Sequence, residues 1–205
     1  RTRDLEGAVL AAGGVHVGTG ALERLGELVP GDGQVEIVSD ARVAGIYGMD
    51  VQLALGARAR AVHELAPGEQ AKTVESLEAL WHALRLERSG TLVALGGGCT
   101  TDVAGFVAAT YMRGIAWAPI PTTLVAQVDA ALGGKTGVDI PDLYRRSAGY
   151  VEAAKYGLIA DAAYFGWLEQ NVSAVLAKDA AALTRAIAVA VQGKAEDIRF
   201  AAKNG

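Results

Sequence analysis

The chain has 205 residues, of which 51% are hydrophobic, and a formal net charge of −4. A net negative charge argues against nucleic acid as a partner, and a single cysteine excludes an internal disulfide framework. The sequence shows no apolar run of membrane-spanning length, so we expect a soluble, cytoplasmic protein of one domain or one and a half.

Helices and strands alternate in the first part of the sequence. Residues 8–18 alternate loosely and predict two short strands or one bent strand, and residues 20–29 predict a helix with its leucines on one side. Residues 35–40 predict a strand that ends at Asp40. An acidic residue there holds a ribose in a dinucleotide-binding fold, and it is equally suited to be the N-cap of the helix predicted over residues 41–56.

The next two elements continue the alternation. Residues 60–65 predict a strand, in which His63 is expected at the core or the sheet edge, and residues 73–86 predict an amphipathic helix with His82 in solvent. The third histidine, His16, is interpreted as structural. Because the alternation continues through residue 131, we expect a Rossmann-like α/β domain: a parallel sheet with helices on both faces and ligands at the carboxyl ends of its strands.

A glycine-rich turn lies at the centre of the sequence. Residues 91–95 predict a buried strand, three glycines follow at 96–98, and a helical run begins near Thr100. Glycines let the backbone approach a pyrophosphate, and the N–H groups at a helix N-terminus favour an anion. The turn therefore predicts a phosphate cradle, with a plain tight turn as the alternative. It is not the usual dinucleotide pattern, because Thr101 stands where the last glycine would be.

Four sequence blocks carry a resemblance to a known family. They are GGGCTTDVAGFVAATYMRG at 96–114, PTTLVAQVD at 121–129, GGKTG at 133–137 and EAAKYG at 152–157. Together they resemble the dehydroquinate synthase family of sugar-phosphate cyclases, and the resemblance covers most of the chain. It implies a lyase of the shikimate pathway that uses NAD catalytically to convert 3-deoxy-arabino-heptulosonate 7-phosphate to 3-dehydroquinate and phosphate.

The resemblance also implies which residues form the site. The catalytic residues would be Arg113, Asp129, Lys135, Lys155 and Lys194. The cofactor NAD would contact Asp40, Glu69, Lys72, Gly97, Gly98, Asp102, Thr122, Thr123 and Lys135. Glu152 would be a ligand of a divalent metal, zinc or cobalt.

Some of these residues have plainer interpretations. Glu152 and Lys155 are spaced as a surface ion pair on a helix, and Lys135 is also typical of a solvated loop. Thr122 can equally cap a helix that begins at Leu124. For Lys135, the two adjacent glycines favour close approach to a ligand.

The character of the sequence changes after residue 140, where strand signals disappear. Helices are predicted over residues 147–159, 161–171 and 178–202. We therefore expect an NAD-binding α/β domain over residues 1–140 and a partial helical domain for substrate and metal over residues 141–205.

The sequence also departs from the family pattern. A Gly-Lys-Asn segment expected between residues 138 and 152 is absent, and the three histidines match neither of the family's metal-binding histidines. We therefore expect part of a longer protein that binds a small sugar phosphate, forms a homodimer as is usual in the family, and binds neither nucleic acid nor a membrane. The alternatives are a related cyclase of the aminodehydroquinate or valiolone type, and a non-catalytic NAD-binding fragment.

Overall fold

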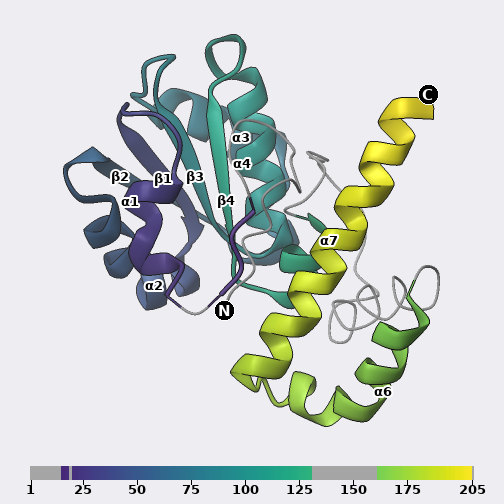
Figure 1. The fold of residues 1–205 in the computed structure, drawn as a ribbon. Helices are drawn as coiled ribbons and strands as arrows, with labels where there is room; N and C mark the ends of the chain where they lie inside the picture. The colour runs from purple at the N-terminus through teal and green to yellow at the C-terminus, as the bar shows by residue number, and fades with distance from the viewer. Residues whose placement is uncertain (1–14, 19, 131–160, 205) are drawn as a thin grey trace.

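A four-stranded parallel sheet forms the centre of the computed structural model, which describes residues 15–18, 20–130 and 161–204 (Figure 1). The strands are β1 (Val35–Asp40), β2 (Ala59–Leu65), β3 (Thr91–Gly96) and β4 (Ala116–Pro121). Their order in the sheet is β2-β1-β3-β4, and every neighbouring pair is parallel. The predicted parallel α/β architecture is confirmed.

Helices cover both faces of this sheet. On one face lie α1 (Leu25–Leu28) and α2 (Ala41–Leu55), and on the other lie α3 (Val74–Ala83) and α4 (Gly98–Thr110). The connections contain 3-10 turns η1 (Leu22–Arg24), η2 (Gly56–Arg58), η3 (Gly68–Ala71) and η4 (Tyr111–Arg113), and a π-helical turn η5 (Ala126–Ala130). Among the described residues, no helix is both long and apolar enough to cross a membrane.

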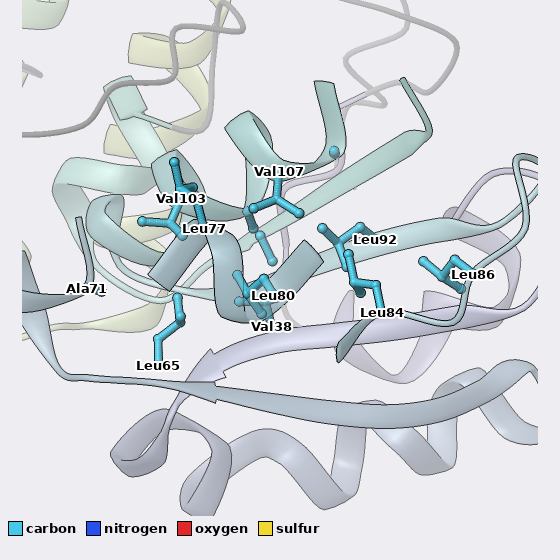
Figure 2. Close-up of a cluster of buried hydrophobic side chains, with 13 residues drawn as sticks. Val38, Leu65, Ala71, Leu77, Leu80, Leu84, Leu86, Leu92, Val103 and Val107 are labelled. Atoms are coloured by element: carbon cyan, nitrogen blue, oxygen red, sulfur yellow. The ribbon is translucent and has the colours of Figure 1, made fainter. Parts of the chain in front are cut away.

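The larger core lies between the sheet and the helices α3 and α4. Side chains alternate along the strands, so Leu92 and Ala94 of β3 face this core while Val93 and Leu95 face α2. All of β3 is buried, as expected for a central strand covered on both faces. The members of the cluster, drawn as sticks in Figure 2, are Val38, Leu65, Ala71, Leu77, Leu80, Leu84, Leu86, Leu92, Ala94, Val103, Ala104, Val107 and Ala108.

Two helices follow the sheet, α6 (Ala162–Leu176) and α7 (Ala180–Asn204), seen in green and yellow in Figure 1. Asp161 caps α6, because its Oδ1 accepts a hydrogen bond of 2.9 Å from the amide of Tyr164. The Tyr164 hydroxyl donates to the carbonyl of Ala186 at 2.8 Å and so ties α6 to α7. Val128 of η5 is buried in the same cluster, so η5 packs against these helices.

The predicted helix over residues 73–86 is too long at its C-terminal end. The helix stops at Ala83, and Leu84 is extended with ψ 140°. The reason is tertiary: the amide of Arg85 donates to the buried carboxylate of Glu36 at 3.1 Å instead of continuing the helix. The side chain of Leu84 is thereby turned into the core.

The remaining element predictions agree to within a few residues, where the structure describes them. The helix predicted over residues 20–29 is η1 followed by α1, and α6 extends five residues beyond the predicted end at 171. Val15 forms only an isolated bridge. The rest of the region predicted as strand, residues 8–14, and the helix predicted over residues 147–159 lie outside the described residues.

The three histidines lie away from any common centre, in keeping with their interpretation. His63 is on the edge strand β2, where its Nε2 lies 2.6 Å from Glu36 Oε2. His82 has 81% of its side chain exposed on α3, and His16 is also exposed.

Arg58 stabilises the segment that leads into β1, and its removal is expected to destabilise the fold. Its guanidinium donates to the carbonyls of Gly33, Val29 and Pro30 at 3.1, 3.0 and 3.0 Å. We expect Arg58→Ala to lower the free energy of unfolding by about 2–3 kcal/mol, because three part-buried carbonyls lose a charged donor. Urea unfolding measures the change. The exposed Arg60 is the control, and Arg60→Ala should change stability by less than about 0.5 kcal/mol; equal effects of the two substitutions would contradict the interpretation.

Candidate functional site

The turn between β3 and α4 is the centre of the candidate site. Gly97 is the N-cap of α4, in an extended conformation, and it offers no side chain to the first amides of the helix. The carbonyl of Gly97 accepts from the amide of Thr101 at 3.0 Å, which starts the helical hydrogen bonds. The first N–H groups of a helix have no intrahelical acceptor, and the helix dipole is positive there. This end of α4 is therefore suited to an anion, as the sequence predicted.

The glycines of this turn are required by close packing. A Cβ at Gly97 would lie 3.2 Å from Thr123 Cγ2, and one at Gly98 would lie 3.3 Å from Ala130 Cβ. Neither glycine has a positive φ, so the need for glycine comes from space and not from backbone conformation. A larger side chain would occupy the space in front of the helix N-terminus that a phosphate group needs.

Asp40 lies at the same edge of the sheet, at the end of β1 beside β3. Its Oδ1 accepts a hydrogen bond of 3.0 Å from the amide of Val43, so its prediction as the N-cap of α2 is confirmed. Ser39 Oγ donates to the carbonyl of Leu95 at 2.7 Å, which ties the ends of the two strands together. A carboxylate has about four acceptor positions, so the cap leaves Asp40 able to accept from a ribose hydroxyl.

A small charged network lies beside the glycine turn. Lys72 Nζ is 2.7 Å from Asp102 Oδ2 on α4 and 3.5 Å from Glu69 Oε2 on η3. Cys99 Sγ lies 2.8 Å from the other oxygen, Glu69 Oε1. These contacts join the segment after β2 to the first turns of α4. The structure therefore brings Glu69, Lys72 and Asp102 together at the carboxyl edge.

Asp102 titrates unusually in this setting. Burial raises the pKa of its carboxyl above the ordinary value of 3.8, the hydrogen bond and charge of Lys72 act in the opposite direction, and the charge of Asp129 raises the pKa further. Asp129 lies on η5, so its charge acts on Asp102 from the segment that packs against the glycine turn. The carboxylates of Asp102 and Asp129 thus interact electrostatically.

This coupling predicts how stability depends on pH. Because the pKa of Asp102 is higher in the folded chain, the folded state holds the proton to higher pH than the unfolded state. The contribution of Asp102 to stability therefore falls as the pH rises from 3.8 through the folded pKa. We expect the free energy of unfolding of the parent, compared with that of Asp102→Asn, to decline across this pH range. When Asp129 is also replaced by Asn, the pH range should be narrower, because the charge that raises the pKa of Asp102 is removed. Urea unfolding over a pH series measures both; a difference that rises with pH would contradict the assignment.

The paired threonines follow β4 directly against the turn. The amide of Thr122 donates to the carbonyl of Gly96 at 2.9 Å, and Thr123 Oγ1 accepts from the amide of Ala126 at 3.3 Å. The helical cap is therefore Thr123, and the alternative interpretation of Thr122 as the cap is wrong. Thr123 occupies the cap because its hydroxyl, one residue closer to Leu124, reaches the amide three positions on.

Arg113 lies at the opposite edge of the sheet. It follows the C-terminal end of α4, and β4 then begins beside the first residue of β3. A helix of 13 residues spans roughly 20 Å, so Arg113 is about that far from the glycine turn. Met112 and Arg113 both have positive φ, 50° and 68°, which is costly for residues other than glycine.

Four other predicted site residues have no described side chain. Lys135, Glu152 and Lys155 lie outside the described residues, and Lys194 is on α7 without a described side chain. Within the described ranges, no group of three or more histidine, cysteine or acidic side chains is placed to hold a metal ion. The metal-site prediction at Glu152 therefore stays a prediction.

The contact of Cys99 with Glu69 could not be predicted from the sequence. The two residues are 30 positions apart, and no local pattern connects them. The only available signal was the position of Cys99 in the first turn of a helix beside a candidate anion site.

Two family profiles match the chain. The profile described as 3-dehydroquinate synthase N-terminal matches residues 62–170, which is more than half of the chain. The profile described as 3-dehydroquinate synthase C-terminal matches residues 149–202. The first match includes the glycine turn and the charged network around it.

Curated relatives are similar over most of the chain. The 3-dehydroquinate synthase of Caulobacter vibrioides is 41% identical over 216 residues, covering 89% of this chain and 58% of the relative. The 3-dehydroquinate synthase of Bordetella pertussis is 39% identical over 213 residues, covering 89% of this chain and 60% of the relative. The chain thus spans about three fifths of their length. An alignment of 216 positions exceeds the 205 residues of the chain, so the Caulobacter relative has internal residues that this chain lacks.

Solved structures of related cyclases share the fold. The 2-epi-5-epi-valiolone synthase of Streptomyces hygroscopicus, with NAD+ and Zn2+ bound, matches with a TM-score of 0.71 and 26% identity over 93% of this chain and 63% of that one. A 2-deoxy-scyllo-inosose synthase complexed with carbaglucose-6-phosphate, NAD+ and Co2+ matches with a TM-score of 0.53 and 34% identity. This match covers 60% of this chain and 36% of the synthase chain.

Three findings point to the same family: the sequence blocks at the glycine turn, the profile that covers more than half of the chain, and the relatives at about 40% identity. The chain belongs to the 3-dehydroquinate synthase family.

Proposed function

We propose that the protein is a 3-dehydroquinate synthase, which converts 3-deoxy-arabino-heptulosonate 7-phosphate to 3-dehydroquinate and phosphate. The proposal rests on the glycine turn of this chain, which lies in the part that matches the family and is suited to an anion. Glu69, Lys72 and Asp102 lie together beside this turn. The overall reaction eliminates phosphate, which makes the enzyme a carbon–oxygen lyase, and we propose that it acts in the cytoplasm.

The described residues fit NAD at the carboxyl edge of the sheet. The N-terminus of α4 would hold the pyrophosphate, and the glycines there leave the space that it needs. Asp40, Glu69 and Lys72 would contact the ribose side, while Asp102, Thr122 and Thr123 would line the path of the cofactor. When bound, NAD supplies a hydride acceptor that is restored within each turnover. The structures of two related cyclases contain NAD+.

The substrate would lie beside η5. Asp129 would orient a ring hydroxyl, and Lys135, Lys155 and Lys194 would supply positive charge around the departing phosphate. Glu152 would be one ligand of a divalent metal, zinc or cobalt, the ions present in the related cyclase structures. Such a metal polarises hydroxyl and carbonyl oxygens of the substrate.

We also propose that the protein is a homodimer in which Arg113 acts on the partner's site. Arg113 lies roughly 20 Å from the glycine turn of its own chain, which is too far for a shared substrate. The adjacent Met112 is 50% exposed and lines an open apolar hollow with Trp81 and Tyr111. A second copy docked there would cover this surface and bring in Arg113.

Mixing two inactive variants tests the homodimer. Arg113→Ala and Asp129→Asn should each lose activity alone, but a mixed dimer would contain one site with both residues intact. Activity that returns on mixing supports action across the interface. If the mixture stays inactive although differently tagged copies of the two variants co-purify as mixed dimers, Arg113 does not act in this way.

Two simultaneous assays test the proposed reaction. Incubation of the purified protein with the heptulosonate 7-phosphate, NAD and zinc or cobalt should release inorganic phosphate without lasting absorbance from NADH. NAD binding without phosphate release would indicate a non-catalytic NAD-binding protein. Phosphate release with a steady rise in NADH would contradict a cofactor that is restored in each cycle.

A second candidate function is a valiolone-type cyclase, because the match to a valiolone synthase structure covers 93% of the chain. The same phosphate assay with sedoheptulose 7-phosphate distinguishes the two. Faster release from sedoheptulose 7-phosphate than from the heptulosonate would favour this alternative, and an aminodehydroquinate-type enzyme would require the amino analogue of the substrate.

A further inference from the structure

Cys99 lies where it can act on the cofactor site through a neighbouring residue. It is in the first turn of α4, directly after the glycine turn, and its thiol is half-buried. The Sγ atom donates a hydrogen bond of 2.8 Å to Glu69 Oε1 on η3. A thiol that donates to a carboxylate is not the thiolate that nucleophilic chemistry requires. The contact therefore indicates a role in geometry.

Glu69 is held from two sides by this arrangement. Its Oε1 accepts from Cys99, while its Oε2 lies 3.5 Å from Lys72 Nζ. Lys72 is itself fixed by Asp102 at 2.7 Å. Because Cys99 and Asp102 are three residues apart, they lie on one face of α4. The helix whose N-terminus faces the cofactor thus also sets the direction of the Glu69 carboxylate.

The geometry points to Cys99 as a positioning residue, whose thiol orients the Glu69 carboxylate for a hydroxyl of the cofactor ribose. This inference rests on the proposed binding of NAD. A carboxylate can accept several hydrogen bonds, so Glu69 can accept from Cys99 and from a ribose hydroxyl at once. An acceptor that is already oriented loses less conformational freedom when the ligand binds, which favours affinity.

A titration with NAD of the purified protein and three variants tests the role. Cys99→Ala removes the donor, Cys99→Val removes it while keeping a larger apolar side chain, and Cys99→Ser keeps a donor of similar size. We expect Ala and Val to weaken NAD binding by about five- to tenfold, which is the net contribution of one typical hydrogen bond, because the Glu69 carboxylate loses the donor that orients it. Ser should stay within about twofold of the parent, and all three should unfold within a few degrees of it.

Inorganic pyrophosphate provides a second probe, because it can occupy the helix N-terminus but has no ribose. Its affinity should be the same in the parent and in Cys99→Ala if the thiol acts through Glu69. An equal loss of NAD and pyrophosphate affinity in the Ala variant would place the effect in the glycine turn and overturn the inference.

Two other results would also overturn it. If the parent binds NAD and the Ala and Val variants bind within twofold of it, the thiol has no positioning role. If Ser weakens binding as much as Ala, a donor at this position is not what matters. A parent that binds no NAD would instead contradict the proposed function, and the role of Cys99 would fall with it.

Discussion

Gly97→Val is expected to weaken NAD binding by about a hundredfold, equivalent to about 3 kcal/mol. The Cβ alone would lie 3.2 Å from Thr123 Cγ2, so there is no room for further methyl groups on the side of Thr123. We expect them to occupy space at the helix N-terminus instead. That space is where the pyrophosphate would accept from the first amides of α4. Losing one or two hydrogen bonds to a charged group accounts for the size of the effect. Equilibrium titration with NAD measures it.

A matched substitution separates this local effect from a general one. Gly166 lies on α6, and a Cβ there would meet no atom within 4 Å. Gly166→Val should therefore leave the NAD affinity unchanged. Thermal unfolding of both variants shows whether each is folded at the temperature of the titration. If folded Gly97→Val binds NAD as tightly as the parent, the cofactor does not bind at this turn.

The centre of the fold could be predicted from the sequence because its signals are local. The apolar run at 91–95 is followed by three glycines at 96–98, of which the first ends β3 and the last begins α4. A fully buried parallel strand requires such a run, and a cluster of glycines after it marks where the strand ends in a turn. The carboxyl edge of the sheet, and with it the location of a ligand site, follows from that one turn.

The end of α3 could not be predicted, because distant residues determine it. Apolar spacing continues through Leu86, and nothing local stops the helix. It ends because Glu36, 49 positions away from Arg85, takes the Arg85 amide, and because the side chain of Leu84 is buried in the core. Periodicity describes one face of a helix and contains no information about a buried carboxylate on a strand.

The candidate site divides in the same way. The family resemblance indicated Glu69, Lys72 and Asp102, and the structure brings them together at the edge where ligands were expected. What the sequence did not indicate is how they are held, since the contact of Cys99 with Glu69 joins two segments with no common motif. The position of Arg113 at the far end of α4 was likewise implied only by the length of that helix.

Gly33→Ala is expected to cause the largest loss of stability, about 3 kcal/mol, from the addition of one methyl group. A Cβ at Gly33 would collide with the carbonyl oxygen of Ser89 and lie 2.8 Å from its carbon. Both are backbone atoms, so no side chain can move aside. The amide of Thr91 donates to the carbonyl of Gln34 at 3.0 Å, which joins the segments entering β1 and β3 at this point.

The same substitution at Gly45 should have the opposite sign, which makes it the control. Gly45 is exposed within α2, and a Cβ there would meet nothing within 4 Å. Alanine in a helix interior is favoured over glycine by roughly 0.5–1 kcal/mol, so Gly45→Ala should stabilise the protein. Urea unfolding of both variants measures the difference. Both α2 and the turn at Gly33 pack beside β1. If the two substitutions lower the free energy of unfolding by similar amounts, added methyl groups disturb this side of the sheet in general, and the contact with Ser89 is not the cause.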